Sequence, residues 1–202
     1  SHALHADGVY YESGDRLWVN LYVPSTATWQ SMGAGLAVET TLPEGDTATL
    51  RVTVPSPRTF SLVLRRPGWA LEGFSVSVNG SAVSELPQPQ GYLTLARTWK
   101  SGDVVELKLP KTLRLEPVPD NPRRAAILWG PLVLAGDVGP GGDFPVWKPG
   151  TVPVLVAADR PVAEWLLPVS GKPGHFRTEG VGRDREVDFV PFYRLHRRTY
   201  GI

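Results

Sequence analysis

Apolar and polar residues alternate with a period of two along much of the chain. The clearest run is Thr47–Val54, where Ala48, Leu50, Val52 and Val54 alternate with threonine and arginine. Successive side chains of a β-strand point to opposite faces of its sheet, so this pattern predicts a half-buried antiparallel strand. Similar patterns predict strands at Leu17–Val23, Phe60–Leu64, Phe74–Val78, Tyr92–Ala96, Val104–Leu109, Leu113–Glu116, Ala125–Leu128 and Leu132–Ala135.

Two of these segments carry more specific expectations. In Leu17–Val23, the leucines and valines are expected to share one face, with Trp18, Asn20 and Tyr22 on the other. The segment that ends at Val78 is followed by Asn79-Gly80, a pair that supplies the positive φ angles of a two-residue hairpin turn.

The spacing of the strands predicts the fold class. No window of a dozen residues keeps a helical apolar stripe free of Pro and Gly. Many short strands at intervals of about 8–12 residues are typical of a β-sandwich. One sandwich commonly takes about 100 residues, so the 202 residues fit two in tandem. We therefore expect an all-β chain of two consecutive antiparallel β-sandwiches, jelly-roll or Ig-like.

The boundary between the two domains is expected where prolines interrupt the strand pattern, at Pro117–Arg124. This gives a first domain at residues 1–116, with a short N-terminal remnant of a linker, and a second at residues 117–202. The glycine-rich stretch Val138–Gly150 is expected to be a long loop in the second domain. The closing run Val190–Tyr200 is expected to be its last strand.

Composition excludes several classes of function. The 21 basic and 20 acidic residues nearly cancel, so no overall field favours nucleic acid or an anionic membrane. No apolar run approaches the roughly 18 residues of a membrane span. Nothing at Ser1 resembles a signal peptide. Because the sequence does not begin with Met, the missing signal does not distinguish a cytoplasmic protein from a secreted one. The absence of cysteine excludes disulfides, zinc thiolates and thiol nucleophiles within the chain.

Histidines and carboxylates give no convergent motif. His2 and His5 are three residues apart but lack partner ligands, and the other two histidines, His175 and His196, are isolated. No G-x-S-x-G elbow is present. Glycoside hydrolysis uses paired carboxylates, but nothing in the sequence brings together any two of the candidates, Asp15, Glu39, Glu116 and Asp188. We therefore predict no catalytic, cofactor-binding or metal-binding residue in this chain.

The tryptophans, a basic cluster and a glycosylation sequon are candidates for binding or modification, but each also has a structural explanation. Seven tryptophans could stack on sugars, but they are spread evenly, as core residues are: Trp18, Trp29, Trp69, Trp99, Trp129, Trp147 and Trp165. Arg194, His196, Arg197 and Arg198 form a basic cluster that is more typical of a solvated strand edge than of a nucleic-acid site. Asn79-Gly80-Ser81 matches a glycosylation sequon, which its hairpin role explains.

Several short motifs, in this order and spacing, resemble a known family. They are Leu17–Ser25, Glu39–Pro43, Leu64–Trp69, Val78–Gly80, Gly91-Tyr92, Trp99–Asp103, Leu113–Pro117, Gly130–Gly136 and Pro191–His196. Together they resemble the C-terminal half of the bacterial β-L-arabinofuranosidases, glycoside hydrolase family 127, formerly a domain of unknown function. The resemblance covers nearly the whole chain.

The resemblance implies that the chemistry lies elsewhere. Family members carry an N-terminal (α/α)6 barrel with the active site, followed by two β-sandwiches. They retain configuration by means of a cysteine nucleophile near a zinc ion held by Cys and Glu, and another Glu acts as the acid/base. The nucleophile lies in a Cys-Cys pair just before the segment that matches Ser1–Tyr11. We therefore expect the barrel to be missing from this chain, and only His2 to approach the active site of an intact enzyme.

Three hypotheses follow. In the first, the chain is a non-catalytic region of a glycoside hydrolase whose partner is its own N-terminal barrel. In the second, it is an autonomous module that binds a plant-type oligosaccharide through exposed Trp or Tyr. In the third, it is a sandwich-type interaction domain.

Overall fold

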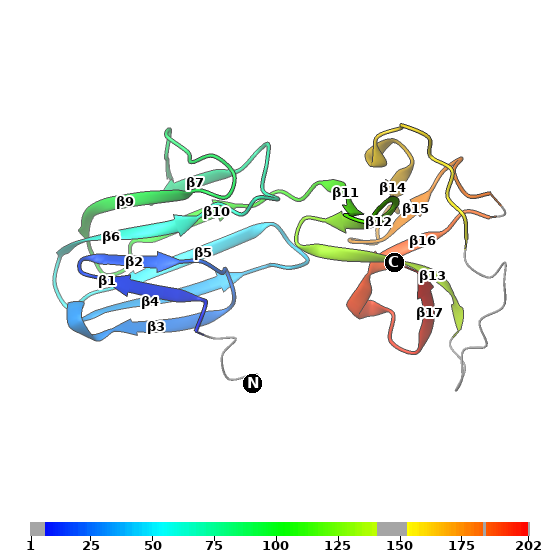
Figure 1. Ribbon diagram of the computed structural model, residues 1–202. Helices are drawn as coiled ribbons and strands as arrows, with labels where there is room; N and C mark the ends of the chain where they lie inside the picture. The colour runs from blue at the N-terminus through cyan, green and yellow to red at the C-terminus, as the bar shows by residue number, and fades with distance from the viewer. Residues whose placement is uncertain (1–6, 141–152, 184, 202) are drawn as a thin grey trace. The chain divides into compact units, whose positions relative to one another are not determined.

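The computed structural model describes residues 7–140, 153–183 and 185–201. Its contacts divide the chain into two compact units, Ser1–Lys111 and Thr112–Ile202. Strands and short 3-10 turns make up the regular structure of the described residues, so the all-β prediction is confirmed (Figure 1).

The first unit consists of two sheets that face each other. One has the strand order β1-β2-β6-β9 and the other has the order β3-β4-β5-β10-β7-β8. The strands are β1 (Tyr10–Ser13), β2 (Arg16–Val19), β3 (Ser25–Trp29), β4 (Ala34–Thr40), β5 (Thr47–Thr53), β6 (Arg58–Arg65), β7 (Ser75–Val78), β8 (Ser81–Ala82), β9 (Tyr92–Trp99) and β10 (Val104–Lys108); the 3-10 turn η2 (Gln30–Met32) follows β3.

The core of the first unit lies between these sheets and follows the predicted alternation. Ala48, Leu50 and Val52 of β5 are buried, and Leu62 and Leu64 of β6 belong to the same cluster. One pair departs from the antiparallel expectation, because β2 and β6 run parallel. Between them the chain passes through β3–β5 of the other sheet, and such a long crossover lets it return in the same direction.

The alternation predicted for Leu17–Val23 holds only as far as the end of β2. Leu17 and Val19 are buried, but Leu21 and Val23 are 41% and 40% exposed, and Tyr22 is buried in their place. The Tyr22 hydroxyl donates a hydrogen bond to the Arg65 carbonyl at 2.7 Å. Burial raises the pKa of the Tyr22 phenol, so this hydroxyl stays protonated and remains a donor.

The second unit is built on strands that connect into one sheet. Its order is β11-β12-β13-β16-β15-β14, and β17 also pairs with β13. The elements are β11 (Leu113–Val118), β12 (Asn121–Trp129), β13 (Leu132–Pro140), η3 (Val162–Glu164), β14 (Leu166–Pro168), β15 (Phe176–Thr178), β16 (Asp188–Pro191), η4 (Phe192–Arg194) and β17 (Arg198–Gly201).

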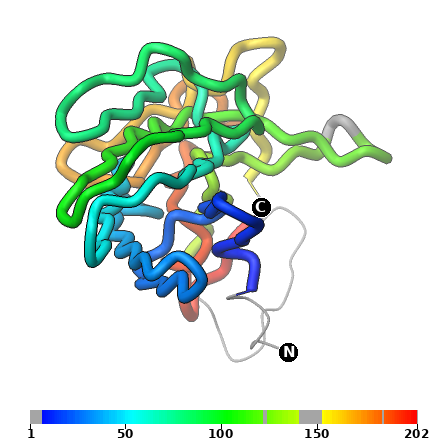
Figure 2. The backbone as a smooth tube through the Cα atoms, turned by 90° about the vertical axis from the view of Figure 1, so that its left-hand side faces the viewer, coloured from blue at the N-terminus to red at the C-terminus, as the bar shows by residue number. Residues whose placement is uncertain are grey.

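Three expectations for the second unit need correction. The stretch Pro117–Arg124 is a hairpin of β11 and β12, and the 116/117 boundary falls inside β11 (Figure 2). Pro117 is tolerated because β11 is an edge strand, where a ladder hydrogen bond can be missing. The expected loop Val138–Gly150 begins as strand, since β13 reaches Pro140, and residues 141–152 lie outside the described residues.

The closing run is not one strand. It starts at the end of β16, turns through η4 and re-enters the sheet as β17. Arg197, in the turn before β17, has a φ of 57°, a left-handed conformation that a continuous strand cannot contain. The two strands pair with parts of β13 that share only Gly136: Val190 lies opposite Ala135, and Tyr200 lies opposite Asp137.

Candidate functional site

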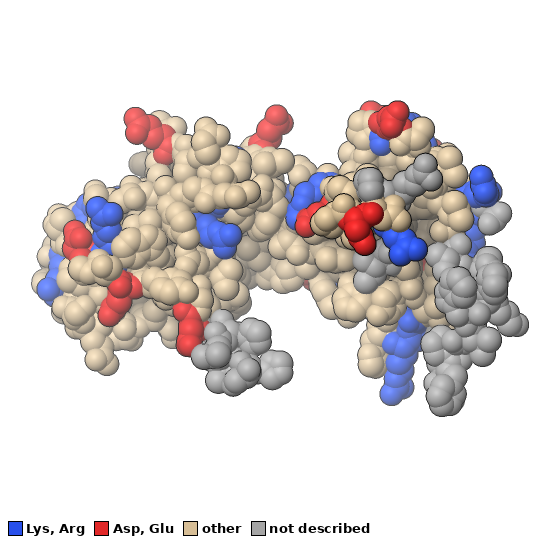
Figure 3. Space-filling model, viewed as in Figure 1, with Lys and Arg blue, Asp and Glu red and all other residues tan. Residues whose placement is uncertain are grey.

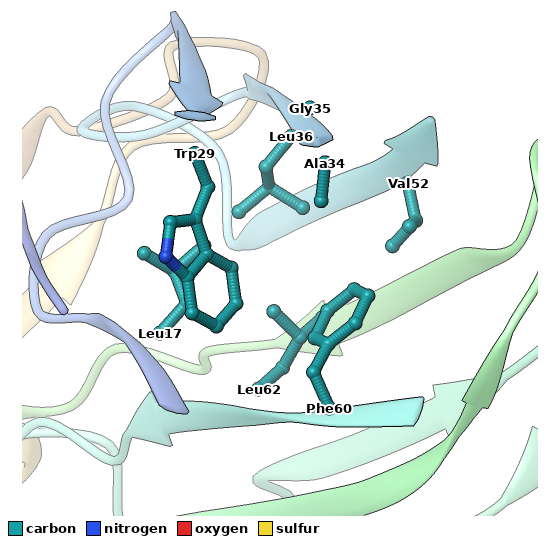
Figure 4. Close-up of a pocket in the computed structure, with 8 residues that line it drawn as sticks. All are labelled: Leu17, Trp29, Ala34, Gly35, Leu36, Val52, Phe60 and Leu62. Atoms are coloured by element: carbon teal, nitrogen blue, oxygen red, sulfur yellow. The ribbon is translucent and has the colours of Figure 1, made fainter. Parts of the chain in front are cut away.

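The one cavity that stands out in the described part of the first unit is a packing gap in its core. It holds about 10 Å³ and is lined by apolar side chains (Figure 4). They are Leu17, Trp29, Ala34, Gly35, Leu36, Val52, Phe60 and Leu62. A water would need polar partners there, and a sugar would need far more room. The gap is therefore not a ligand site.

The described part of the chain brings together no set of side chains that could bind a metal ion. No three His, Asp or Glu side chains gather there in a way that could hold a metal ion, and the sequence has no cysteine. His2 and His5 lie outside the described residues. His196 is exposed and His175 is half-buried. The zinc that the family resemblance implies for a catalytic domain thus does not fit the described residues of this chain.

The four candidate carboxylates are dispersed over the sheets. Asp15 lies in the exposed turn between β1 and β2. Each of the others lies near an arginine of its own sheet: Glu39 is 3.8 Å from Arg51, Glu116 is 3.7 Å from Arg114, and Asp188 is 3.5 Å from Arg177. These are solvated ion pairs on strands and not a pair of acids that face one substrate.

Two other carboxylates are held tightly, but both support turns. Asp103 accepts hydrogen bonds from the Lys100 backbone N–H and the Asn79 amide, each at 2.9 Å. These bonds, the first above all, hold the pKa of Asp103 below its usual range. Asn79 in turn accepts a bond from the Val104 N–H at 2.8 Å. The Asn79-Gly80 turn, with φ of 51° and 78°, is thereby tied to β10, and the predicted hairpin is confirmed.

Glu186 plays the same part in the second unit. It accepts a short hydrogen bond from the Thr178 hydroxyl and another from the Gly180 N–H at 2.9 Å. The Thr178 bond is the main reason why the pKa of Glu186 is lowered. The Val187 N–H donates to the same Thr178 hydroxyl at 2.8 Å, which closes the loop between β15 and β16. In the described residues, every buried side-chain nitrogen or oxygen has a partner, so none of them awaits a ligand.

The tryptophans in the described residues serve mainly the two cores. Trp29, Trp99 and Trp165 are buried, and Trp69 and Trp129 pack against the clusters from their edges. Trp147 lies outside the described residues. Trp18 differs, because its neighbours Leu17 and Val19 face the core and it points to the opposite side of β2.

The basic cluster at the end of the chain is divided. Arg198 forms a bidentate contact with Asp137, at 2.8 Å and 3.0 Å to Oδ1. Arg194 donates to the Pro173 carbonyl at 2.9 Å, and His196 and Arg197 are exposed in the turn before β17. Beside them three aromatic side chains are exposed: Phe192 at 44%, Tyr193 at 51% and Tyr200 at 43%. A single strand would have placed Phe192 and Tyr193 on opposite faces, so their joint exposure could not be predicted from the strand pattern.

Another surface that the sequence did not predict is the outward face of the sheet β1-β2-β6-β9. Tyr11 lies opposite Trp18, Trp18 lies beside Val63, and Val63 lies opposite Thr94, which forms one row across four strands. We call Tyr11, Trp18, Val63 and Thr94 the outer row. The available signal was the uninterrupted apolar run Leu62-Val63-Leu64, which does not alternate. No helix in the described part of the chain is long and apolar enough to cross a membrane.

Comparisons with known proteins point to one family. Residues 16–111 match the family model described as β-L-arabinofuranosidase, GH127 middle domain. A GH127 β-L-arabinofuranosidase from Geobacillus stearothermophilus T6 matches 92% of this chain with a TM-score of 0.61 and 23% identity. A structure described as a glycoside hydrolase matches 95% with a TM-score of 0.64 and 23% identity. A GH127 β-arabinofuranosidase matches 96% with a TM-score of 0.64 and 25% identity.

The chain corresponds to only part of these proteins. It covers 32%, 35% and 34% of the three structures, or about a third of each. No curated protein matches. At such identities the structural likeness shows the fold, and the family model adds a match to one region. The first unit is therefore similar to the middle domain of GH127 β-L-arabinofuranosidases, and the whole chain has the fold of about one third of such a protein.

Proposed function

We propose that this chain is a non-catalytic β-sandwich region of a GH127-type glycoside hydrolase and that it supports a catalytic (α/α)6 barrel in the same polypeptide. The observation that carries this proposal is the match of residues 16–111 to the GH127 middle domain. A structural likeness over more than nine tenths of the chain supports it.

The chemistry of the described residues agrees with a supporting role. Retaining and inverting glycosidases place two carboxyl groups on either side of the scissile bond. Here the candidate acids lie near arginines or in turns, and the cavity in the core is apolar. We place the nucleophilic cysteine, the zinc ion and the acid/base glutamate outside this chain, which has no cysteine. The choice of substrate, including β-L-arabinofuranosides, then rests with the barrel.

Deletion in the complete gene product tests the proposal. We expect removal of residues 10–202 to lower the temperature of thermal unfolding and the yield of soluble protein, because the barrel surface that this chain covers becomes exposed. Hydrolysis of a β-L-arabinofuranoside should fall with it. A deletion variant that keeps both its stability and its activity would contradict a supporting role.

A titration distinguishes this function from the autonomous sugar-binding module. The 202-residue chain is titrated with arabino-oligosaccharides while tryptophan fluorescence is followed, and lysozyme at equal concentration serves as a control for non-specific changes. A supporting region should give a flat response. A saturable response would favour the module instead.

A further inference from the structure

The outer row is unusual because it lies on the side of its sheet that faces away from the core. Tyr10, Leu17 and Leu64 contact the core cluster, so the alternate residues of the same strands point outward. Outward positions of a half-buried antiparallel sheet are ordinarily polar. Here they include an aromatic pair and a valine in adjacent strands.

The opposite sheet of the same unit shows what an ordinary solvated face looks like. In β5 the outward positions hold threonines and Arg51, β10 adds Glu106 and Lys108, and β7 adds Ser75 and Ser77. The two faces belong to one unit but differ in composition. The apolar outer row is therefore a property of this face and does not follow from the fold class.

The neighbours of Val63 shield it, although no core covers that side. Val63 is 3% exposed and Ser61, the next outward residue of β6, is 6% exposed. Around them Tyr11 is 55% exposed and Tyr92 is 45% exposed. The face thus has a shielded centre with exposed aromatic side chains around it, and aromatic residues are enriched at protein interfaces.

The outward strand positions of this face are basic wherever they are charged. The outward positions of the four strands include Arg16 and Arg65 and no carboxylate. In Figure 3 the side of the first unit that carries β1, β2, β6 and β9 is mainly uncharged, with acidic and basic side chains scattered around it. A partner that matches the face would bring apolar side chains to the centre and carboxylates to the two arginines.

A sugar ligand fits this face less well than a protein does. The Tyr92 hydroxyl already donates to Asn20 Oδ1 at 2.8 Å, and the Thr59 and Thr98 hydroxyls bond each other at 2.8 Å. Val63, at the centre, offers no hydrogen bond. Sugar sites need several polar groups that converge and remain free to pair with hydroxyls.

We propose that the outer row is the docking surface for the domain that precedes this chain in the same polypeptide. This inference rests on the proposed function. The matched region is a middle domain, so in the proposed parent another domain precedes it, and the chain enters through β1, the edge strand that carries Tyr11. A domain tethered at this point has a high effective concentration at the outer row.

Side-chain oxidation in the complete protein tests the docking. Tyr11, Trp18 and Tyr92 are labelled by hydroxyl radicals in the complete protein and in the 202-residue chain, and the labelled sites are quantified by mass spectrometry. We expect these three residues to lose most of their modification in the complete protein. Leu71, 43% exposed and outside the four strands, serves as the reference that should change little. Equal labelling of the outer row in both proteins would overturn the proposal.

A pair of matched substitutions tests the same surface by steric blockade. Thr94→Arg puts a long cation into the outer row on the edge strand β9, and Thr28→Arg puts the same residue on the exposed face of the edge strand β3. We expect Thr94→Arg to lower the Tm of the complete protein and to leave that of the 202-residue chain unchanged. Thr28→Arg should change neither. Equal effects of the two substitutions on the complete protein would contradict the docking.

The outcomes separate this inference from the proposed function. If deletion of residues 10–202 destabilises the complete protein while the outer row remains fully labelled, the supporting role stands and the docking surface lies elsewhere. If the deletion has no effect, both proposals fail. Protection of Tyr11 and Trp18 by arabino-oligosaccharide in the complete protein, and not by the rest of the polypeptide, would overturn the docking and assign the face to a sugar.

Discussion

The two units of this protein build their cores in different ways. In the first unit, two facing sheets contribute alternate strand residues to one continuous cluster. In the second, the cluster combines Leu134 and Phe189 of the sheet with Val162 of η3, with Trp165 just after that turn, and with Val181 of a loop. A second small cluster there contains Ala135, Val190 and Leu195. Strand alternation thus specifies most of the first core, although Tyr22, Ala70 and Phe74 join it from loops. The second core depends more on irregular segments held in place by side-chain bonds.

Truncation of a buried tryptophan in each unit gives the largest expected effect. Trp99 is fully buried, donates to the Phe60 carbonyl at 3.0 Å and stacks on the Phe60 ring. Trp165 is 3% exposed and donates to the Arg160 carbonyl at 3.2 Å. Each substitution by Ala should lower the free energy of unfolding by about 3–5 kcal/mol. Hydrogen exchange followed by mass spectrometry should locate the lost protection in the mutated unit alone, and loss in both units would show that their cores are coupled.

A substitution in the turn network around Asp103 should have the next largest effect on the free energy of unfolding. Asp103→Asn replaces a carboxylate that accepts two hydrogen bonds and should cost about 1–3 kcal/mol at pH 7. Because the pKa of Asp103 is lower in the folded state, its stabilisation is present above the unfolded pKa of about 3.9 and is lost as the pH falls through the folded pKa. Urea unfolding of both proteins from pH 7 to pH 2 should show the difference in stability shrinking at the acid end. A difference that does not depend on pH would rule out the ionised carboxylate as its source.

Glu186→Gln makes the matching test in the second unit. The pKa of Glu186 is also lowered, chiefly by the Thr178 hydroxyl, so its contribution should likewise disappear in acid. The loop between β15 and β16 should then lose protection from hydrogen exchange at neutral pH, while the turn at Asn79 keeps it. An unchanged loop would mean that the second core holds this segment without its side-chain bonds.

The contact between Arg198 and Asp137 should contribute less to the free energy of unfolding than the turn networks do. Both side chains are partly exposed, at 41% and 25%, so solvent screens their attraction. Arg198→Lys keeps the charge but loses the bidentate geometry, and it should cost about 0.5–1 kcal/mol. Urea unfolding at low and high salt should show a smaller difference at high salt. A loss well above this range would indicate that the β13–β17 pairing depends on this one contact.

The smallest effect is expected on the solvated face of the first unit. Glu39 and Arg51 are 53–68% exposed and their charged atoms are 3.8 Å apart. Glu39→Gln should change the free energy of unfolding by less than about 0.5 kcal/mol, at any salt concentration. Urea unfolding checks this, and a clear loss would mean that the polar face of β4 and β5 is not simply solvated.

Sequence patterns predicted the first unit better than the second. Period two located β5, β6, β7, β9 and β10, and Asn79-Gly80 correctly marked a hairpin. The pattern failed where a strand ended early, because Tyr22 is buried through a hydrogen bond to a residue 43 positions away. The strands β14 and β15 were not predicted, since each has only three residues, too few to show a period.

The candidate surfaces were harder to predict from the sequence than the strands. Trp18 could be placed on one side of β2, but nothing local shows that Tyr11 and Val63 join it in one row. That row depends on the pairing of β1 with β2 and of β2 with β6, and β2 and β6 are more than forty residues apart. The exposed aromatics near Tyr200 likewise depend on the turn at Arg197, which a strand pattern does not reveal.

Local patterns in the sequence were enough to predict that the chain is all-β, that it carries no thiol chemistry, and which residues form most of the first core. These properties follow from composition and from the two-residue period of a strand, which are local. The folded chain was needed to show how strands distant in sequence are ordered, which outward face is apolar, and how the closing run divides into β16, η4 and β17. Pairing between distant strands sets these features, and the chain pattern records which way a side chain points but not what lies beside it.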